Sequence, residues 1–466
     1  MYTLDPKKPV PVHFIGIGGI SMSGLARILV KEGFPVSGSD REESELTREL
    51  EAAGIRVACP QSADNIRRFS EPEPIGLVVY TAAIHPDNPE YAAAAAAGIP
   101  MMTRAELLGE IMSHYRDSVA VAGTHGKTTT TAMISRILVD AGTDPTVSVG
   151  AIVPEIGGNL RIGDGNSFVA EACEYTNSFL SLCPRYAVIL DIEADHLDFF
   201  KDLNDIRSSF ARFAGLVPED GAIVIGDNVE KPEEITGACA CKRVVTFGLS
   251  EKADVRASEI SYSGAGSSFL MSFSDGAEPV RVSLSVPGEH NILDALAAAA
   301  VAKLMGIDAR LTAGSLAHFG GAARRFEILG EWRGATIVDD YAHHPTEIAA
   351  TLSAARGMGY SRIWCIFQPH TYTRTKAFLD GFADALQAAD LVVLADIYAA
   401  RETDTLGISS ADIMAKIRKN GHSCEYFPSF SAIKSHLLKN CREGDLLIFM
   451  GAGEVDKICY SMLEEE

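Results

Sequence analysis

The chain has 466 residues, of which 47% are apolar and 22% are charged. This length predicts about three domains, and the composition excludes wholesale disorder, collagen-like repeats and coiled coil. The 41 basic and 62 acidic residues give a formal charge of −21, which repels nucleic acid and anionic membranes at long range. We therefore expect no nucleic-acid partner, and any phosphate ligand requires a local cluster of cations.

The nine cysteines are scattered and include no CxxC pair. Cys239 and Cys241 form a CxC, but no nearby Cys or His completes a zinc site. The first twelve residues lack a signal-peptide pattern, and no apolar run reaches the ~18 residues that span a bilayer. We expect a reduced, cytoplasmic protein without membrane insertion, present as a monomer or weak homodimer.

The first expected element is a strand that runs into a glycine turn over residues 12–19, followed by a helix. The turn resembles the dinucleotide fingerprint G-x-G-x-x-G at Gly16 and Gly18, with Ser21 in place of the third glycine. Asp40 ends the next strand, where a ribose-binding acid stands in that fold. Alone, the motif leaves NAD, another nucleotide or close packing open.

More strands and helices complete this first block. We expect a buried strand over residues 76–84, an alanine-rich helix over 91–98 and a helix opened by a capping box of Thr103 and Glu106. Strands that alternate with helices predict a parallel sheet. We assign residues 1–116 to a Rossmann-like domain.

The second block opens with a strand, a glycine turn and a helix, in the segment SVAVAGTHGKTT. Such a turn points backbone N–H groups at an anion. Lys127 can reach phosphate oxygens there, and the Thr128 hydroxyl can bind Mg²⁺. Val121 stands where a full P-loop has glycine, so this is a shortened variant. The alternative is a helix N-terminus with a surface lysine.

Two later strands of this block end in residues that can bind a metal. Glu171 and His196 each follow an apolar strand, and such strand ends face the ligand crevice of an open α/β sheet. They could hold Mg²⁺ beside the phosphate turn, with Glu174, Asp195 and Asp198 as rival ligands. Taken singly, each acid is better explained as a solvated loop charge.

The remainder of the second block changes character. Polar alternation over residues 260–286 predicts antiparallel strands, and the long helix that follows carries His290 and Asn291 at its start. We expect a P-loop ATPase-like central domain over residues 117–325 and a second Rossmann-like domain over 326–466. The predicted fold class is therefore α/β with three domains.

The third block gathers polar residues at strand ends. Two acids and two histidines lie together in residues 339–344, and His370 and Arg374 follow the next strand. This density indicates a site rather than isolated structural histidines. Arg324 and Arg325 lie between the second and third blocks. They are either a solvated pair or a hinge element that carries cations to a phosphate when domains close.

These motifs resemble those of the Mur ligases, in the same order and over nearly the whole chain. The shared segments are HFIGIGGISMSGLA, GTHGKTTTTAM, EACEYTNSFL, DIEADHLDFF, GEHNILDALAA, RRFEILGE, VDDYAHHPTEI, FQPHTYTRT and FMGAGEV. Within the family, the chain most resembles members that join L-alanine to UDP-N-acetylmuramate. The resemblance implies an ATP- and Mg²⁺-dependent carbon–nitrogen ligase of peptidoglycan precursor synthesis, which serves cell-wall biogenesis, cell shape and cell division.

The resemblance also implies a ligand for each domain. The first domain would bind the UDP-sugar through Gly16, Gly18, Gly19 and Asp40. The central domain would bind ATP through Gly123, Thr124, His125, Gly126, Lys127, Thr128, Thr129, His290 and Asn291, joined by Arg325, Asp340 and Tyr341. Mg²⁺ would be held by Thr128, Glu171 and His196. The third domain would place His343, His370 and Arg374 at L-alanine and the reacting carboxyl.

The implied reaction has two steps. The lactyl carboxylate attacks the γ-phosphorus of ATP to give an acyl phosphate and ADP, and the alanine amine then displaces phosphate. Lys127, Arg325 and Mg²⁺ would neutralise charge, and His343 or His196 would take the amine proton. With Arg374, these residues form the expected catalytic set. Domain closure would keep water from the acyl phosphate.

Two departures and three alternatives accompany this interpretation. Thr371 stands where some relatives carry a further arginine, which weakens the expected grip on the amino-acid carboxylate. The segment IRSSFARFA lacks the lysine that is modified in ligases of longer intermediates, which fits an alanine-adding enzyme.

The alternatives are a recycling ligase that adds a preformed tripeptide, an NAD-dependent oxidoreductase that depends on the incomplete first glycine motif, and a nucleotide-binding regulator without turnover.

Overall fold

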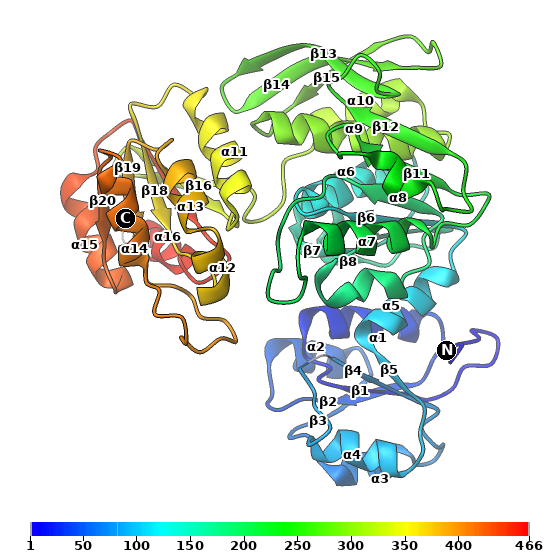
Figure 1. Ribbon diagram of the computed structural model, residues 1–466. Coiled ribbons are helices and arrows are strands. Elements are labelled where there is room, and N and C mark those ends of the chain that lie inside the picture. Colours follow the sequence, from blue (N-terminus) through cyan, green and yellow to red (C-terminus); the bar gives the residue numbers. More distant parts are fainter. Residues whose placement is uncertain (1, 82, 465–466) are drawn as a thin grey trace.

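The computed structural model describes residues 2–81 and 83–464 and shows three α/β domains, each built on its own sheet (Figure 1). The predicted fold class is confirmed. Within the described residues the sheets have five, ten and six strands in chain order. The boundaries expected after residues 116 and 325 stay predictions. No helix in the described part of the chain has the length and apolar character that a bilayer crossing requires.

The first sheet is parallel, in the order β3-β2-β1-β4-β5. Its strands are β1 (Val12–Ile15), β2 (Val36–Ser39), β3 (Arg56–Ala58), β4 (Leu77–Tyr80) and β5 (Met101–Thr103). Its helices are α1 (Ile20–Lys31), α2 (Glu45–Ala52), α3 (Ala63–Phe69), α4 (Pro89–Ala96) and α5 (Arg104–Ser113). The order reverses between β1 and β4, so the glycine turn after β1 lies at the switch point of a Rossmann-like sheet. The predicted capping box opens α5.

The central sheet has a parallel core, β13-β12-β11-β10-β6-β9-β7, and antiparallel pairing at both edges, where β14 and β15 follow β13 and β8 follows β7. Its strands are β6 (Asp117–Ala122), β7 (Thr146–Val153), β8 (Gly158–Arg161), β9 (Ser167–Glu171), β10 (Tyr186–Ile189), β11 (Ala222–Gly226), β12 (Val244–Gly248), β13 (Val255–Ser263), β14 (Gly266–Phe273) and β15 (Val280–Leu284). The polar alternation thus correctly predicted the antiparallel strands β13 to β15.

The helical segments of this domain are α6 (Lys127–Asp140), α7 (Leu203–Ala214), α8 (Pro232–Thr236), α9 (Glu289–Leu304), α10 (Ala309–Ala317) and the 3₁₀ turns η1 (Pro154–Ile156) and η2 (Tyr175–Ser181). Successive side chains of β6 pack alternately into two different hydrophobic clusters. Val119 and Val121 pack in the cluster that contains α6, α9 and α10. Ala120 and Ala122 pack on the other side, with α5 and α7. This two-sided burial explains why β6 is a continuous apolar run.

The third sheet has the order β16-β17-β21-β18-β19-β20, with only β16 antiparallel among its described strands. The strands are β16 (Glu327–Trp332), β17 (Ala335–Asp340), β18 (Arg362–Phe367), β19 (Leu391–Leu394), β20 (Cys424–Tyr426) and β21 (Asp445–Met450). The helices are α11 (Pro345–Arg356), α12 (Tyr372–Ala377), α13 (Leu379–Leu386), α14 (Ser410–Lys419), α15 (Phe430–Asn440) and α16 (Asp456–Leu463). Two separate hydrophobic clusters cover its two faces.

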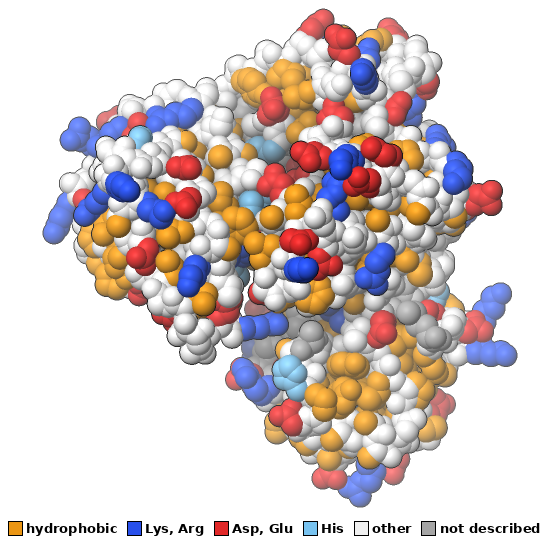
Figure 2. All heavy atoms as spheres, in the orientation of Figure 1, with side chains coloured by type: hydrophobic (Ala, Val, Ile, Leu, Met, Phe, Trp, Pro, Cys, Tyr) orange, Lys and Arg blue, Asp and Glu red, His pale blue; other side chains and the backbone are white. Residues whose placement is uncertain are grey.

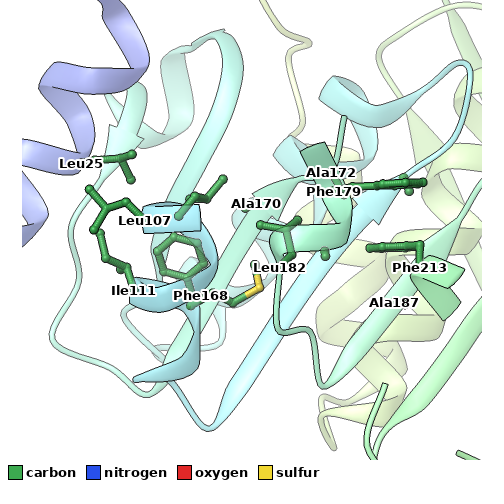
Figure 3. Close-up of a cluster of buried hydrophobic side chains, with 14 of the residues drawn as sticks. Leu25, Leu107, Ile111, Phe168, Ala170, Ala172, Phe179, Leu182, Ala187 and Phe213 are labelled. Carbon is green, nitrogen blue, oxygen red and sulfur yellow. The ribbon is translucent and has the colours of Figure 1, made fainter. Parts of the chain in front are cut away.

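The first and central domains share one hydrophobic cluster, whereas the third domain is joined by polar contacts. In Figure 3, Leu25 of α1 and Leu107 and Ile111 of α5 gather beside Phe168 of β9. Apolar burial of this kind holds two domains together as one unit. The third domain meets the central one through ion pairs and hydrogen bonds such as Arg374–Asp195. A polar interface permits the domain motion that closure requires.

Gly109 marks the closest approach between α5 and the central domain. A Cβ atom there would overlap the backbone carbonyl of Ser181. We expect Gly109→Ala to lower the free energy of unfolding by about 1–3 kcal/mol, because backbone must move. Gly314→Ala in α10 is the matched control, since nothing lies within 4 Å of the added Cβ; it should be neutral or slightly stabilising. Urea unfolding compares the two, and equal midpoints would contradict this close packing.

Candidate active site

The turn between β6 and α6 is shaped by two glycines. Gly123 and Gly126 have φ angles of +150° and +78°, a region that side chains disfavour. A Cβ atom on Gly126 would also overlap the carboxylate of Asp294 in α9. The backbone therefore passes close beneath α9 and enters α6, whose N-terminal N–H groups form an anion site.

Lys127 folds back over this turn. Its Nζ donates to the carbonyl oxygens of Gly123 at 2.5 Å and Thr124 at 3.1 Å, and lies 3.1 Å from Glu174 Oε2. Burial alone would lower the pKa of Lys127, but the Glu174 carboxylate outweighs it and raises the pKa above its ordinary value. The lysine is therefore charged, and an incoming phosphate competes with Glu174 for it.

His196 lies on the other side of Glu174. Its Nε2 is 3.7 Å from Glu174 Oε1 and 3.7 Å from Asp195 Oδ2. The ring of Tyr175 covers the imidazole at a centroid distance of 4.6 Å. Two acids and an imidazole thus meet beside the phosphate turn, and two of the three predicted rival ligands are among them.

Glu171 is the acid that was expected to share a metal with His196. It ends β9 and accepts a hydrogen bond from the Gly150 N–H at 2.6 Å. It lines a cavity of about 320 Å³ at the junction of the first and central domains, together with Arg104 and Cys173. Its pairing with His196 on a metal stays a prediction, and Glu174 is the acid that the structure brings to His196.

The side chains beside the turn fit a divalent cation. Glu174 Oε2 is buried and makes no hydrogen bond with any described residue, although Lys127 lies near it. Carboxylate oxygens and hydroxyls are the protein ligands that Mg²⁺ prefers. The Thr128 hydroxyl lies at the start of α6, within 3.3 Å of Arg325 Nη2. Oxygen donors are therefore gathered where the cation of a Mg–ATP complex would be needed.

The two boundary arginines have separate roles. Arg325 reaches across to the central domain and donates to the Thr128 hydroxyl, while its guanidinium lies 5.1 Å from the centre of the Tyr341 ring. Arg324 turns the other way and pairs with buried Asp339 at 3.0 Å. The solvated-pair alternative is therefore wrong. Arg325 approaches the phosphate turn, and Arg324 anchors the linker to the third sheet.

The N-terminus of α9 lies behind the turn. His290 and Asn291 begin this helix as predicted, and Asn291 Nδ2 donates to the Pro287 carbonyl at 2.6 Å. Burial lowers the pKa of His290 to about 4, so its ring is neutral. Asp294 was missed: it accepts from Thr130 at 3.0 Å, and burial raises its pKa to about 8. A lone acid within an alanine-rich helix was the available signal.

His125 of the turn joins the central and third domains. Its Nδ1 lies 3.1 Å from Glu347 of α11 and its Nε2 lies 3.4 Å from Glu193. Burial would lower the pKa of His125, but these carboxylates raise it to about 10, so the ring is charged. His344 lies close to both His125 and Glu193, yet each nitrogen of the two rings already has a polar partner. The cluster therefore acts as an ionic contact between domains.

Three residues expected near L-alanine lie together in the third domain. The rings of His343 and His370 are 5.8 Å apart, and Arg374 Nη1 lies 3.2 Å from His370 Nδ1. Burial lowers the pKa of each of these histidines to about 4, which makes them weaker bases than the ordinary imidazole assumed above. Arg374 also binds Asp195 of the central domain at 2.8 Å.

Asp340 is buried, and its carboxylate accepts hydrogen bonds from residues of its own domain. It accepts hydrogen bonds from the N–H groups of Phe326 at 3.0 Å and Ala342 at 2.7 Å, and from the Thr351 hydroxyl at 3.2 Å. Burial raises the pKa of Asp340 to about 6. These contacts fix the end of β17, and its expected contact with adenosine stays a prediction.

The first glycine turn is held by Asp40. Gly16 has a φ of +86°, and the Gly18 N–H donates to Asp40 Oδ2 at 2.7 Å. Gly19 then precedes α1 as its N-cap. The acid that was expected at a ribose thus lies against the turn itself, and its role in binding the UDP-sugar stays a prediction.

Comparisons with known proteins agree along the whole chain. Residues 11–116, 121–302 and 324–453 match the Mur ligase family catalytic domain, the Mur ligase middle domain and the Mur ligase glutamate ligase domain. A UDP-N-acetylmuramate–L-alanine ligase of Agathobacter rectalis is 55% identical over 465 residues, 100% of each chain. The crystal structure of UDP-N-acetylmuramate-alanine ligase from Thermotoga maritima matches with a TM-score of 0.78 and 30% identity over 98% of this chain and 99% of that one. A murein peptide ligase from Psychrobacter arcticus matches with a TM-score of 0.69 and 26% identity over 98% of each chain.

Proposed function

The chain belongs to the Mur ligase family, and from that premise we propose that it joins L-alanine to the lactyl carboxylate of UDP-N-acetylmuramate with ATP, giving ADP and phosphate. The observation that carries the proposal is a line of polar groups across the domain junction. It runs from Lys127 through Glu174, His196 and Asp195 to Arg374. Figure 2 shows acidic and histidine side chains gathered where the central and third domains meet.

The chemistry follows from where the cations lie. A carboxylate that attacks the γ-phosphate of ATP brings two anions together, so positive charge must be fixed in advance. Lys127 over the turn and Arg325 beside Thr128 supply it. Thr128, Glu171 and His196 would hold Mg²⁺, with Glu174 as a further donor, and a bound Mg²⁺ neutralises phosphate charge. The third domain covers the acyl phosphate and excludes water.

The second step needs a neutral amine. Uncharged His343 and His370 can accept hydrogen bonds from the incoming amino group, although their lowered pKa values make them poor final proton acceptors. They would therefore orient the amine, and water or a departing phosphate oxygen would remove its proton. ATP is the phosphoryl donor, and we place the enzyme in the cytoplasm.

The recycling ligase is the less supported alternative. Two full-length relatives that are 55% and 52% identical are named UDP-N-acetylmuramate–L-alanine ligases. The murein peptide ligase matches the structure with a TM-score of 0.69, against 0.78 for the alanine ligase. Membership of the family, and the identity of those relatives as ligases, removes the NAD-dependent oxidoreductase and the regulator without turnover.

One assay tests the proposal directly. ADP formation is measured with UDP-N-acetylmuramate, ATP and Mg²⁺ while L-alanine, glycine, L-serine or a preformed tripeptide is supplied alone. We expect L-alanine to give the highest kcat/KM, with glycine and serine lower by about 10- to 200-fold, because one methyl or hydroxyl group contributes little to discrimination. Turnover with the tripeptide alone would contradict the proposal.

Glu171 offers a test of the metal site. We expect Glu171→Ala to raise the Mg²⁺ concentration for half-maximal activity about tenfold or more, because one carboxylate donor is lost. Glu174→Ala is titrated in parallel, and exposed Glu233 of α8, changed to Ala, is the matched control. A Glu171→Ala titration that overlays the control would remove this residue from the metal site.

A further inference from the structure

The carboxylate of L-alanine needs a positive partner, and the cations at the domain junction are largely paired. Arg374 is bound to Asp195, and Lys127 lies against Glu174. His343 and His370 are uncharged near neutral pH. A carboxylate that enters a half-buried site without a cation loses much of its binding energy. A further positive side chain beside the third-domain histidines would therefore strengthen the binding of this carboxylate.

The loop after β19 runs directly alongside those histidines. The Thr371 N–H donates to the Tyr398 carbonyl at 2.8 Å, and the Tyr398 N–H donates to the Pro369 carbonyl at 2.8 Å. The ring of Tyr398 stacks on His370 at a centroid distance of 5.7 Å. This pairing fixes the path of the loop beside the start of α12.

Glu402 provides a second anchor for the same loop. Its carboxylate accepts from the N–H groups of Tyr372 at 2.7 Å and Thr373 at 3.0 Å, and it also binds the Thr373 hydroxyl. Arg401, which precedes it, therefore starts from backbone that is fastened to the first turn of α12. The Glu402 carboxylate already accepts hydrogen bonds from that turn.

Arg401 is the cation that this arrangement leaves available. Its side chain is exposed, and it makes no hydrogen bond or ion pair with the residues at 2–81 and 83–464. Its neighbour Glu402 caps the first turn of α12, and Tyr398 of the same loop stacks on His370. Arg401 therefore lies on backbone that is held beside the third-domain histidines.

We propose that Arg401 binds the carboxylate of L-alanine and so determines which amines the enzyme accepts. The inference rests on the proposed function and names the carboxylate contact that Thr371, which lacks a charge, does not supply. Residue 371 pairs with Tyr398 of the loop that carries Arg401, so the two positions lie on neighbouring segments. The guanidinium is suited to the role because its fork of N–H donors matches a carboxylate in two places.

Steady-state kinetics of the full-length enzyme test this contact. We expect Arg401→Ala to raise KM for L-alanine about 10- to 100-fold, as loss of a charge-assisted pair does. The kcat and the KM values for ATP and UDP-N-acetylmuramate should stay within about twofold. Arg401→Lys should recover part of the affinity. Arg310→Ala, an exposed arginine of α10, is the matched control.

Two further measurements separate this role from a general structural one. L-alaninamide has no carboxylate, so its kcat/KM should be equal in the wild type and in Arg401→Ala. Thr371→Arg added to Arg401→Ala should lower KM for L-alanine again. An unchanged KM for L-alanine in Arg401→Ala, or equal losses with L-alanine and L-alaninamide, would overturn the inference. A wild-type enzyme that does not turn over L-alanine would overturn the proposed function as well.

Discussion

Lys127→Ala is expected to reduce ATP-dependent phosphate release by at least about 10³-fold while the UDP-sugar still binds. The ammonium lies over the phosphate turn, held by two backbone carbonyls and Glu174. Fixed positive charge at a transferring phosphoryl group contributes most of the rate in such reactions. The first glycine turn belongs to a different sheet, so its contacts with the UDP-sugar should survive the substitution.

The design of this experiment must account for the buried partner of the lysine. Removing Lys127 leaves Glu174 with an uncompensated charge, which destabilises the fold. Lys127→Ala/Glu174→Gln removes both charges and should unfold near the wild-type midpoint while remaining inactive. Phosphate release and calorimetric binding of UDP-N-acetylmuramate are measured for each variant, with exposed Lys201→Ala as the control. Equal loss of UDP-sugar binding would contradict the division of labour between the domains.

Much of the fold was predictable because its signals are local. The capping box of Thr103 and Glu106, the glycine turn at Gly123 and the polar alternation before α9 each lie within a few residues, and each forms as expected. Boundaries were less accurate. The expected strand over residues 76–84 is shorter, as Leu77–Tyr80, and the alanine-rich helix begins earlier because Asn88 caps it with Pro89 in the first turn.

The candidate site was predicted less completely, because its contacts join distant parts of the chain. Glu347 contacts His125 although the two residues are 222 positions apart in the sequence, and no local pattern predicts such a pair. Glu174 precedes η2, where Thr176 and Asn177 adopt positive φ angles. Asparagine is enriched in this region but a β-branched threonine is rare there, so the residue types do not predict this turn.

Arg374→Ala is the second substitution for which we expect a large effect, a fall in kcat/KM of about 10²-fold or more. Arg374 and Asp195 are about 9% and 10% exposed, and they join the third domain to the central one at 2.8 Å. The pair lowers the pKa of the Asp195 carboxyl, against the effect of burial, so the acid stays ionised. Removing one member of a buried pair costs about 3–5 kcal/mol, because the other charge is left without a partner.

A double-mutant cycle distinguishes an ion pair that joins the domains from two groups that act independently. If the pair holds the closed arrangement, Asp195→Asn/Arg374→Ala should be no less active than Arg374→Ala alone, because the second change removes the stranded charge. Small-angle scattering should show the single Arg374 variant to be more extended than the wild type, because no hydrophobic cluster of the described residues spans the central and third domains. If Arg374 instead only contacts L-alanine, the Arg374→Ala variant should have a higher KM for that substrate and the same dimensions in solution as the wild type. Additive losses in the cycle would likewise show that Arg374 and Asp195 do not act as one contact.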